Sequence, residues 1–358
     1  METAIGLRET LFGSSTHVGS HEWLKASFHF RDPNSVFSYG LVASKNSVKP
    51  ILMCVQAYIL KNLLFPNVSK KNTRKASADE RVLLHPSMEK QKEALRFALA
   101  DIVWKAGVEK SKCTVCLRVN ETYVQKDNHY TPDGVTEKLR MFEFTKYEDV
   151  INCLSKYQYL FQQESGHGVL MLLYSTLLSR GLDRIHEDLG REYSQLLTPL
   201  GECSQALITL LITGRATPFL HNGVIHFGDV DTVAKPQVGI TGRSEIGFLV
   251  WRRNDDLCSQ LGSRLKTPTF PIWVTCVDDQ YGVLFNPNRD LTRDHRAEHR
   301  FDLHYFNSAP YHTEPTIISL DTRFNKSQEE YGIPPLENLI LTKWQGATVN
   351  WNGTSPVA

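Results

Sequence analysis

The stretch that decides the fold is Tyr39–Phe65, YGLVASKNSVKPILMCVQAYILKNLLF. Its pattern predicts a short strand, a polar loop and then a long helix. Pro50 favours the first helical turn, because the N–H that proline lacks would have no partner there in any case. The residues after Pro50 are apolar on nearly every side of the predicted helix, and such a helix lies in the core of a protein. With roughly 15 residues it is shorter than the about 20 that cross a bilayer.

Lys49 stands at the start of this predicted helix. A helix start carries unpaired N–H groups and the positive end of the helix dipole, so an exposed cation there is disfavoured by about 0.3–1 kcal/mol. The same environment stabilises a thiolate and lowers the pKa of a cysteine. A buried amine would tend to lose its proton. We therefore expect Lys49 to point to solvent or to pair with an acid, and composition alone favours a surface lysine in a loop.

A second segment, Thr267–Phe285 or TPTFPIWVTCVDDQYGVLF, contains an apolar strand, a pair of acids and another apolar run. Together with Val55-Gln56-Ala57 of the first segment, it resembles the MINDY deubiquitinases, in the branch of the third and fourth members. The resemblance spans most of the chain and is closest to an inactive paralogue of the fourth member. Further family-like blocks follow in the same order: Leu11–Thr16, Ala98–Gly107, Ser244–Phe248 and Thr342–Gly353.

The resemblance implies the positions of three catalytic residues, and this chain has a different residue at each. Lys49 lies at the position of the nucleophilic cysteine, Gln280 at that of the general-base histidine, and Ala43 at that of the glutamine that helps to form the oxyanion hole. Asn46 and Ser47 replace two glycines of the loop. A glutamine amide does not titrate near neutral pH and cannot act as that base. On this basis we expect a pseudoenzyme with no catalytic residue, no cofactor and no metal.

An altered hydrolase that uses another thiol is the first alternative. Cys54 lies about 7.5 Å along the helix from the nucleophile position and is turned by roughly 140° from it, so it cannot replace the nucleophile without a shift in register. Cys276 lies in the apolar strand IWVTCV. Buried cysteines of this kind are normally inert. Asp278 and Asp279 are the acids nearest to Gln280 in the sequence, and both are expected in a turn.

Composition narrows the classes of function. The chain has 358 residues, of which 41% are hydrophobic, and this is enough for one large domain with a sizeable core. Its net charge is +1, from 40 basic and 39 acidic residues, so nothing indicates a nucleic acid or a membrane as partner. No apolar run reaches transmembrane length, and the first residues do not resemble a signal peptide. Seven cysteines without such a signal favour free thiols. We expect an intracellular protein, cytoplasmic or nuclear.

The order of the remaining elements predicts the fold class. Helices are expected mainly in the first part of the chain and strands mainly in the last part, which indicates an α+β domain. The resemblance implies a variant of the papain-like cysteine protease superfamily, with the nucleophile helix packed on a mainly antiparallel sheet. We expect one MINDY-type domain over residues 1–358. The segments are helices at Met88–Ala106 (after Ser87 as N-cap), Val169–Leu178 and Ala206–Thr213, and strands at Cys113–Val119, Pro271–Val277, Gly282–Phe285, Phe301–Phe306 and Thr316–Leu320.

Several polar regions are expected at the surface. Asn67–Arg81 is basic and predicts an exposed loop, Gln125–Leu139 predicts a mobile insertion, and His221–Val238 is typical of a loop. Cys113 and Cys116 form a CxxC, but no second Cys or His pair follows at zinc spacing, so we interpret them as core residues. Four histidines are expected to be solvated rather than metal ligands: His295, His299, His304 and His312.

The function expected from the resemblance is recognition of ubiquitin without cleavage. The predicted pseudoenzyme would bind ubiquitin or polyubiquitin through surfaces separate from the three replaced side chains. Two alternatives stand beside it. One is a weakly active cysteine-type deubiquitinase with a relocated nucleophile, and the other is a structural interaction protein that does not bind ubiquitin.

Overall fold

The computed structural model describes residues 1–43, 46–66, 83–190, 194–226, 236–253, 261–310, 312–323 and 332–354. Helices dominate the first part of the described chain and strands the last part, in agreement with the expected α+β class. The helices are α1 Glu2–Phe12, α2 His21–Lys25, α3 Lys49–Leu64, α5 Met88–Gly107, α6 Tyr147–Gln162, α7 Gly168–Arg180, α8 Leu182–Leu189, α9 Gln205–Thr213, α11 Ser263–Lys266 and α12 Pro335–Leu341. The strands are β1 Cys113–Arg118, β2 Leu139–Phe144, β3 Val224–Ile225, β4 Gln237–Val238, β5 Gly247–Trp251, β6 Ile272–Val277, β7 Gln280–Phe285, β8 Arg300–Phe306, β9 Thr316–Asp321 and β10 Thr348–Asn350.

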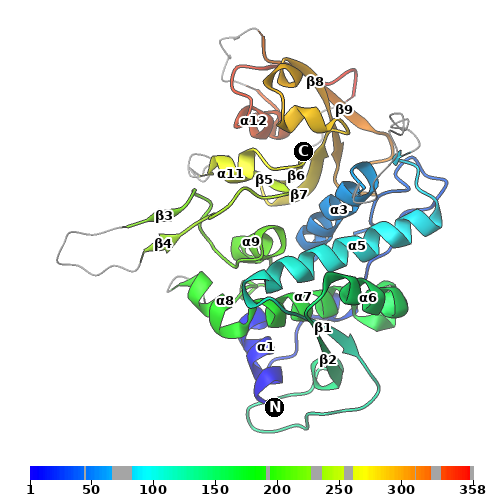
Figure 1. Cartoon of the computed structure of the whole chain (residues 1–358), viewed down its shortest axis with the longest axis vertical. Coiled ribbons are helices and arrows are strands. Elements are labelled where there is room, and N and C mark those ends of the chain that lie inside the picture. Colours follow the sequence, from blue (N-terminus) through cyan, green and yellow to red (C-terminus); the bar gives the residue numbers. More distant parts are fainter. Residues whose placement is uncertain are drawn as a thin grey trace.

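The described chain is arranged in layers around α3 (Figure 1). A six-stranded sheet of order β10-β9-β8-β7-β6-β5 packs on one side of α3 through β6 and β7, and α5 packs on another side. Beyond α5 lie α6 and α7, and the β1–β2 pair follows at the end of the molecule that holds the N-terminus. Helices α11 and α12 pack against β5, away from α3. Helix α3 therefore lies at the centre of the fold.

Helix α3 is buried because every side of it meets another layer. All of its residues except Asn62 are buried, and Pro50 lies in its first turn, which confirms the prediction. Gln56 is the polar residue at its centre. The Gln56 side chain accepts a hydrogen bond from the Leu41 N–H at 2.7 Å and donates one to the Tyr39 carbonyl at 3.0 Å. The helix thus satisfies buried backbone groups of the segment that leads into the loop before it.

The six-stranded sheet is mainly antiparallel, as expected, with one parallel pair between β5 and β6. All residues of β6 are buried. A Cβ atom at Gly247 would lie 2.2 Å from the side chain of Trp273, so only glycine allows β5 to approach β6 this closely. Asp278 and Asp279 form the tight turn between β6 and β7, with φ angles of 44° and 63°, and this confirms the expected turn.

Local signals predicted the long helices well. The Ser87 hydroxyl accepts a hydrogen bond from the Lys90 N–H at 3.4 Å, so the N-cap of α5 is confirmed. Helices α7 and α9 and strand β1 also lie where the pattern placed them. The short helices α8 and α12 and the parallel strand β5 were not predicted. A single large cluster of buried hydrophobic residues extends from Leu7 to Ala347 and joins the helical layers to the sheet.

The polar segment Gln125–Leu139 was predicted to be a mobile insertion, but from Tyr130 onward it is packed into the fold. Tyr130 is completely buried, and its hydroxyl donates to a carboxylate oxygen of Glu137 at 3.2 Å. The same carboxylate accepts the backbone N–H groups of Asp133 and Gly134. Residues 125–129 are exposed, whereas polar side chains from Tyr130 onward satisfy one another and the backbone inside the fold.

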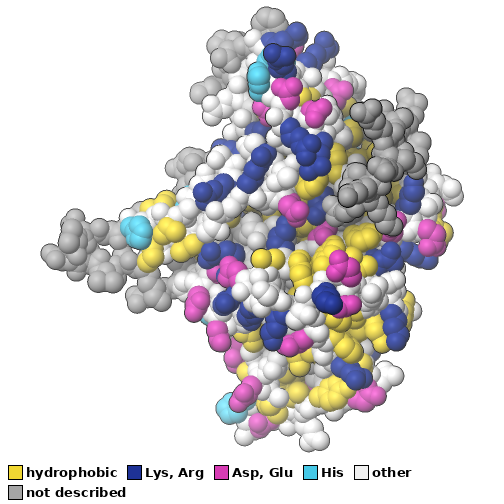
Figure 2. Space-filling view, in the orientation of Figure 1, with side chains coloured by type: hydrophobic (Ala, Val, Ile, Leu, Met, Phe, Trp, Pro, Cys, Tyr) yellow, Lys and Arg dark blue, Asp and Glu magenta, His cyan; other side chains and the backbone are white. Residues whose placement is uncertain are grey.

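His221–Val238 was expected to be a loop, but its described residues include a two-stranded ribbon of β3 and β4. The ribbon projects from the body of the molecule as an arm (Figure 1). Val224 is 47% exposed and Ile225 36% exposed, and hydrophobic side chains gather where the arm leaves the body (Figure 2). The basic segment Asn67–Arg81 lies outside the described residues. Among the helices described, none combines the length and apolar character needed to cross a membrane.

Candidate functional site

The loop before α3 is held by three other parts of the chain. The Ala43 N–H donates to the Ser308 hydroxyl at 2.8 Å, in the loop after β8. The Ser47 hydroxyl donates to a carboxylate oxygen of Glu22 in α2 at 2.7 Å. The thiol of Cys203, just before α9, lies 3.5 Å from the carbonyl of Ser47. Segments far apart in the sequence therefore meet at the start of α3.

Lys49 is the first residue of α3, and it is only 8% exposed. The prediction that it points to solvent or pairs with an acid is wrong. No hydrogen bond or ion pair joins its amine to any residue that the structure describes, and burial lowers the pKa of the amine. Val48 and Pro50 on either side are buried as well, so the chain enters the core before the helix begins. A first-turn side chain also leans toward the helix start, where the neighbouring segments converge.

His312 lies close enough to Lys49 to sense its charge, and it is buried rather than solvated as predicted. Its two ring nitrogens pair with the side chains of Asn307 at 3.0 Å and Thr316 at 3.1 Å. Burial above all, and then the positive charges of Arg31 and Lys49, lower the pKa of His312 to about 4. At neutral pH this imidazole is uncharged and both of its nitrogens are occupied, which suits a structural role.

Gln280 is not brought to Lys49. It is the exposed first residue of β7. The next residue, Tyr281, pairs across the strands with Cys276, and burial followed by the nearby thiols of Cys276 and Cys203 raises its pKa well above the usual value. Tyr281 therefore faces the thiols near the start of α3. Because neighbouring side chains of a strand alternate between its faces, Gln280 points the other way. The roles implied for Ala43, Lys49 and Gln280 stay predictions.

Three thiols lie near the start of α3, and the sequence pattern indicated only two of them. Cys54 and Cys276 are 0% and 1% exposed, so their interpretation as core residues is confirmed. Burial raises the pKa of Cys54, and it raises that of Cys276 to about 11. Cys203 is partly exposed, but burial around its sulfur still raises its pKa well above the usual value. It is 156 residues from Ser47 in the sequence, and no spacing motif connects the two.

The described residues hold no group of three or more His, Cys, Asp or Glu side chains that could bind a metal ion. Cys113 and Cys116 are buried in β1 as core residues. Among the predicted solvated histidines, His295 is exposed with its side chain at 82%, whereas His304 stacks on the ring of Phe285.

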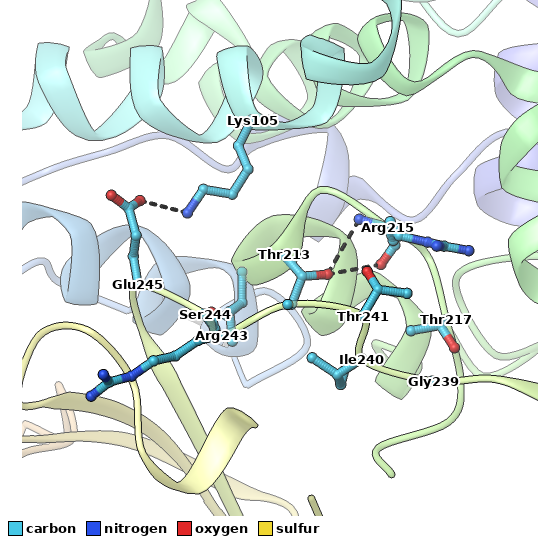
Figure 3. A pocket seen from close by; sticks show the side chains of 12 residues that line it. Lys105, Thr213, Arg215, Thr217, Gly239, Ile240, Thr241, Arg243, Ser244 and Glu245 are labelled. Atoms are coloured by element: carbon cyan, nitrogen blue, oxygen red, sulfur yellow. Dashed lines mark hydrogen bonds and ion pairs between the residues drawn. The ribbon is translucent and has the colours of Figure 1, made fainter. Parts of the chain in front are cut away.

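A cavity of about 260 Å³ lies between α5, the end of α9 and residues 239–245 (Figure 3). Lys105 reaches from α5 to Glu245, with 2.6 Å between the amine and the carboxylate. The guanidinium groups of Arg215 and Arg243 point away from the cavity in opposite directions. Arg215 pairs with Asp188 at 3.1 Å, and Arg243 donates to three backbone carbonyls. Each charged side chain that lines the cavity therefore already has a protein partner.

Comparison with known proteins identifies the family. The sequence model described as "Deubiquitinating enzyme MINDY-3/4, conserved domain" matches residues 8–353. The Homo sapiens protein named "Probable ubiquitin carboxyl-terminal hydrolase MINDY-4" is 36% identical over 360 residues, which cover 100% of this chain and 46% of that protein. The Mus musculus protein of the same name is 35% identical over 354 residues, 98% of this chain and 46% of that protein.

A more distant relative is the Xenopus tropicalis "Ubiquitin carboxyl-terminal hydrolase MINDY-3", which is 26% identical over 260 residues, 67% of this chain and 55% of that protein. The chain spans about half the length of the curated relatives that it matches. No solved structure matches it.

These matches confirm the resemblance and correct one expectation. The prediction that this chain is not an enzyme is contradicted, because the family and its MINDY-4 members bear the names of deubiquitinating enzymes and hydrolases. The family model covers nearly the whole chain. Over the full length of this chain, the identity to the Homo sapiens MINDY-4 protein exceeds a third. This chain belongs to the MINDY-3/4 family of deubiquitinating enzymes.

Proposed function

We propose that this chain recognises ubiquitin or polyubiquitin. The single observation that carries the proposal is the family match over residues 8–353, since the family is named for its action on ubiquitin conjugates. The proposal assumes an intracellular setting, cytoplasmic or nuclear, where ubiquitin conjugates form. It concerns the part of the MINDY-4 relatives that this chain spans.

The architecture around α3 supports the proposal. A buried helix that begins beside a sheet is the arrangement we expect of a papain-like domain, and we propose that relation for this fold. The loop before α3 is tied to α2, to the segment before α9 and to the loop after β8. Residues that are already fixed, as Ala43 and Ser47 are, need not be ordered when a partner arrives, and this reduces the entropy that binding costs.

Titration with ubiquitin chains of defined linkage tests the recognition. The full chain is titrated with monoubiquitin and with diubiquitin of each linkage, and an unrelated protein of similar size serves as the control. We expect saturable binding to at least one ubiquitin form and none to the control. Absence of binding to every form at high micromolar concentration would contradict the proposal and favour an interaction protein without ubiquitin contact.

Hydrolysis of ubiquitin conjugates is a second candidate function, favoured by the names of the MINDY-4 relatives. A thiol protease needs a thiolate close to a base and to donors for the oxyanion. Cys203 is the partly exposed thiol nearest to the start of α3 among the described residues. Its raised pKa keeps it protonated at neutral pH, so use as a nucleophile requires a change in its surroundings.

A ubiquitin derivative with a C-terminal thiol-reactive group tests this candidate. If Cys203 is the nucleophile, the wild-type chain is labelled and Cys203→Ala is not, while the control Cys54→Ala keeps the label. Cleavage of diubiquitin followed in parallel would then be lost in the same variant. If the wild-type chain is neither labelled nor active on diubiquitin of any linkage, thiol hydrolysis by this chain is excluded.

A further inference from the structure

Lys49 is a buried amine for which the described protein supplies no counter-charge. It is 8% exposed, and desolvation is the cause that lowers its pKa, with no carboxylate acting against it. Glu22 of α2 accepts a hydrogen bond from the Ser47 hydroxyl and does not contribute to the lowered pKa of Lys49. Placing an ammonium in such surroundings costs free energy unless a partner is provided.

Two other buried lysine side chains of this chain, Lys61 and Lys343, form ion pairs with carboxylates. Lys61 lies 3.0 Å from Asp101 and 3.4 Å from Glu245. The Lys343 side chain, 8% exposed, lies 3.2 Å from Glu298. Both amines have a carboxylate within hydrogen-bonding or ion-pair distance. Lys49 differs from them among the described residues, and the difference indicates a place for an anion that comes from outside.

The start of α3 also favours an anion, but the N–H groups of its first turn are already engaged. The helix has 16 residues, and its dipole places partial positive charge at this end. The Lys49 N–H already donates to the Asn46 carbonyl, and the Ile51 and Leu52 N–H groups donate to that of Val48. Pro50 has no N–H. The side-chain amine is therefore the charged donor of this first turn, and one charged donor suits a carboxylate better than a phosphate, because a phosphate requires several donors.

The surroundings strengthen a single ion pair. Val48, the residue before Lys49, is 2% exposed, and His312 beside the site is neutral with both nitrogens occupied. A charge-assisted hydrogen bond gains strength where the local dielectric constant is low. The positive charge of Arg31 is committed elsewhere, because its guanidinium donates to the carbonyls of Ala309 and His312.

We propose that Lys49 binds the C-terminal carboxylate of a protein chain and, resting on the proposed recognition of ubiquitin, that this is the free C-terminus of ubiquitin. The amine donates to the carboxylate, and the dipole of α3 adds its field. Ubiquitin joined to another protein has a neutral amide in place of the carboxylate and loses this ion pair. The site thus selects free ubiquitin, or the free end of an unattached chain, over a conjugated C-terminus.

Two forms of monoubiquitin test the selection, one with its natural carboxylate and one with a C-terminal carboxamide. Calorimetric titration of the wild-type chain should show the carboxamide form binding about tenfold to a hundredfold more weakly. In Lys49→Met most of this preference should disappear, with only the small part due to the helix dipole left, and Lys49→Arg should keep part of the preference. Lys25→Met removes an exposed lysine of α2 and serves as the control for general charge effects.

Equal affinity of the wild-type chain for the two forms would overturn the proposal, and so would a preference that persists undiminished in Lys49→Met. Failure of both forms to bind would instead sink the recognition of ubiquitin itself, so the two failures are distinct. Thermal unfolding of each variant verifies that it is folded. If Lys49→Met does not fold, the carboxylate and carboxamide comparison in the wild type still decides the selection.

Discussion

The two ends of α3 each contain a buried lysine, and the two lysines differ in their surroundings. Lys49 at the first residue is 8% exposed and Lys61 in the last turn is 7% exposed. Lys61 lies between the carboxylates of Asp101 and Glu245, and its ammonium also lies 5.3 Å from the ring centre of Tyr58. Lys49 has no ion pair with a described residue. The helix dipole accentuates the contrast, because it favours a cation at the end of a helix and disfavours one at its start.

The difference separates a stabilising charge from a costly one. At the end of α3, Lys61 and Lys105 share Glu245 and connect two helices to the segment before β5. At the start of α3, the amine of Lys49 has lost its hydration without gaining a partner among the described residues. Proteins tolerate such local costs mainly where binding or chemistry requires them. The contrast is therefore the structural basis for placing ligand recognition at the start of the helix.

Removal of the paired lysine should have the largest effect. Lys61→Met removes the counter-charge of Asp101, which keeps only its neutral donors Asn62 and Tyr147 among the described residues, and one of the two ammonium groups at Glu245, so we expect a loss of about 3 kcal/mol in the free energy of unfolding. Urea unfolding at pH 7 measures it, with Lys49→Met as the matched control on the same helix. A loss below about 1 kcal/mol would show that Lys105 and solvent compensate for the missing charge.

Acid should destabilise the fold near the start of α3, through His312. Its pKa in the folded state is about 4 against 6.5 when unfolded, so the unfolded chain binds a proton first as the pH falls. This group therefore contributes stability that is complete above pH 6.5 and is lost toward pH 4, by about 3 kcal/mol. Urea unfolding at pH 7 and pH 4.5 should show a smaller acid effect in His312→Asn. An equal loss of unfolding free energy between pH 7 and pH 4.5 in the wild type and in His312→Asn would contradict the lowered pKa of His312.

Removal of the unpaired lysine should have the smallest effect and the opposite sign. Lys49→Met replaces a desolvated cation by an apolar side chain, and we expect a gain of about 1 kcal/mol at pH 7. The pKa of Lys49 in the folded state lies below its unfolded value of 10.5, so the wild type gains stability as the pH rises between the two. The advantage of the variant should therefore shrink toward pH 10.5. A destabilised Lys49→Met would show that the amine has a partner in the free protein.

Local sequence patterns predicted the elements whose signals are contained in a few turns. Pro50 and the apolar run predicted α3, and Ser87 predicted the start of α5. Elements such as α8, α12 and β5 were missed, because their residues become buried only through distant partners. The segment Gln125–Leu139 was mispredicted for the same reason. Its polar residues suggest exposure, yet their hydrogen bonds are made within the fold.

The candidate site was predictable only in part. The resemblance drew attention to Lys49, Gln280 and Ala43, but its conclusion that the chain is not an enzyme was wrong by the names of its relatives. Burial of His312 and the approach of Cys203 to Ser47 had no local signal. Both depend on how far-separated segments pack, and periodicity within one element carries no information about that packing.

The sequence by itself determined α3, its proline start and the family to which the chain belongs, because helix periodicity and ordered blocks of residues are properties of the linear chain. Only the tertiary structure decided the state of the two lysines. Glu245, which pairs with Lys61, lies 184 residues further along the chain, and the segments around Lys49 bring no carboxylate to its amine among the described residues. The charge of a buried lysine is stabilised by whatever the fold places within a few ångströms, and that distance is set by packing rather than by sequence separation.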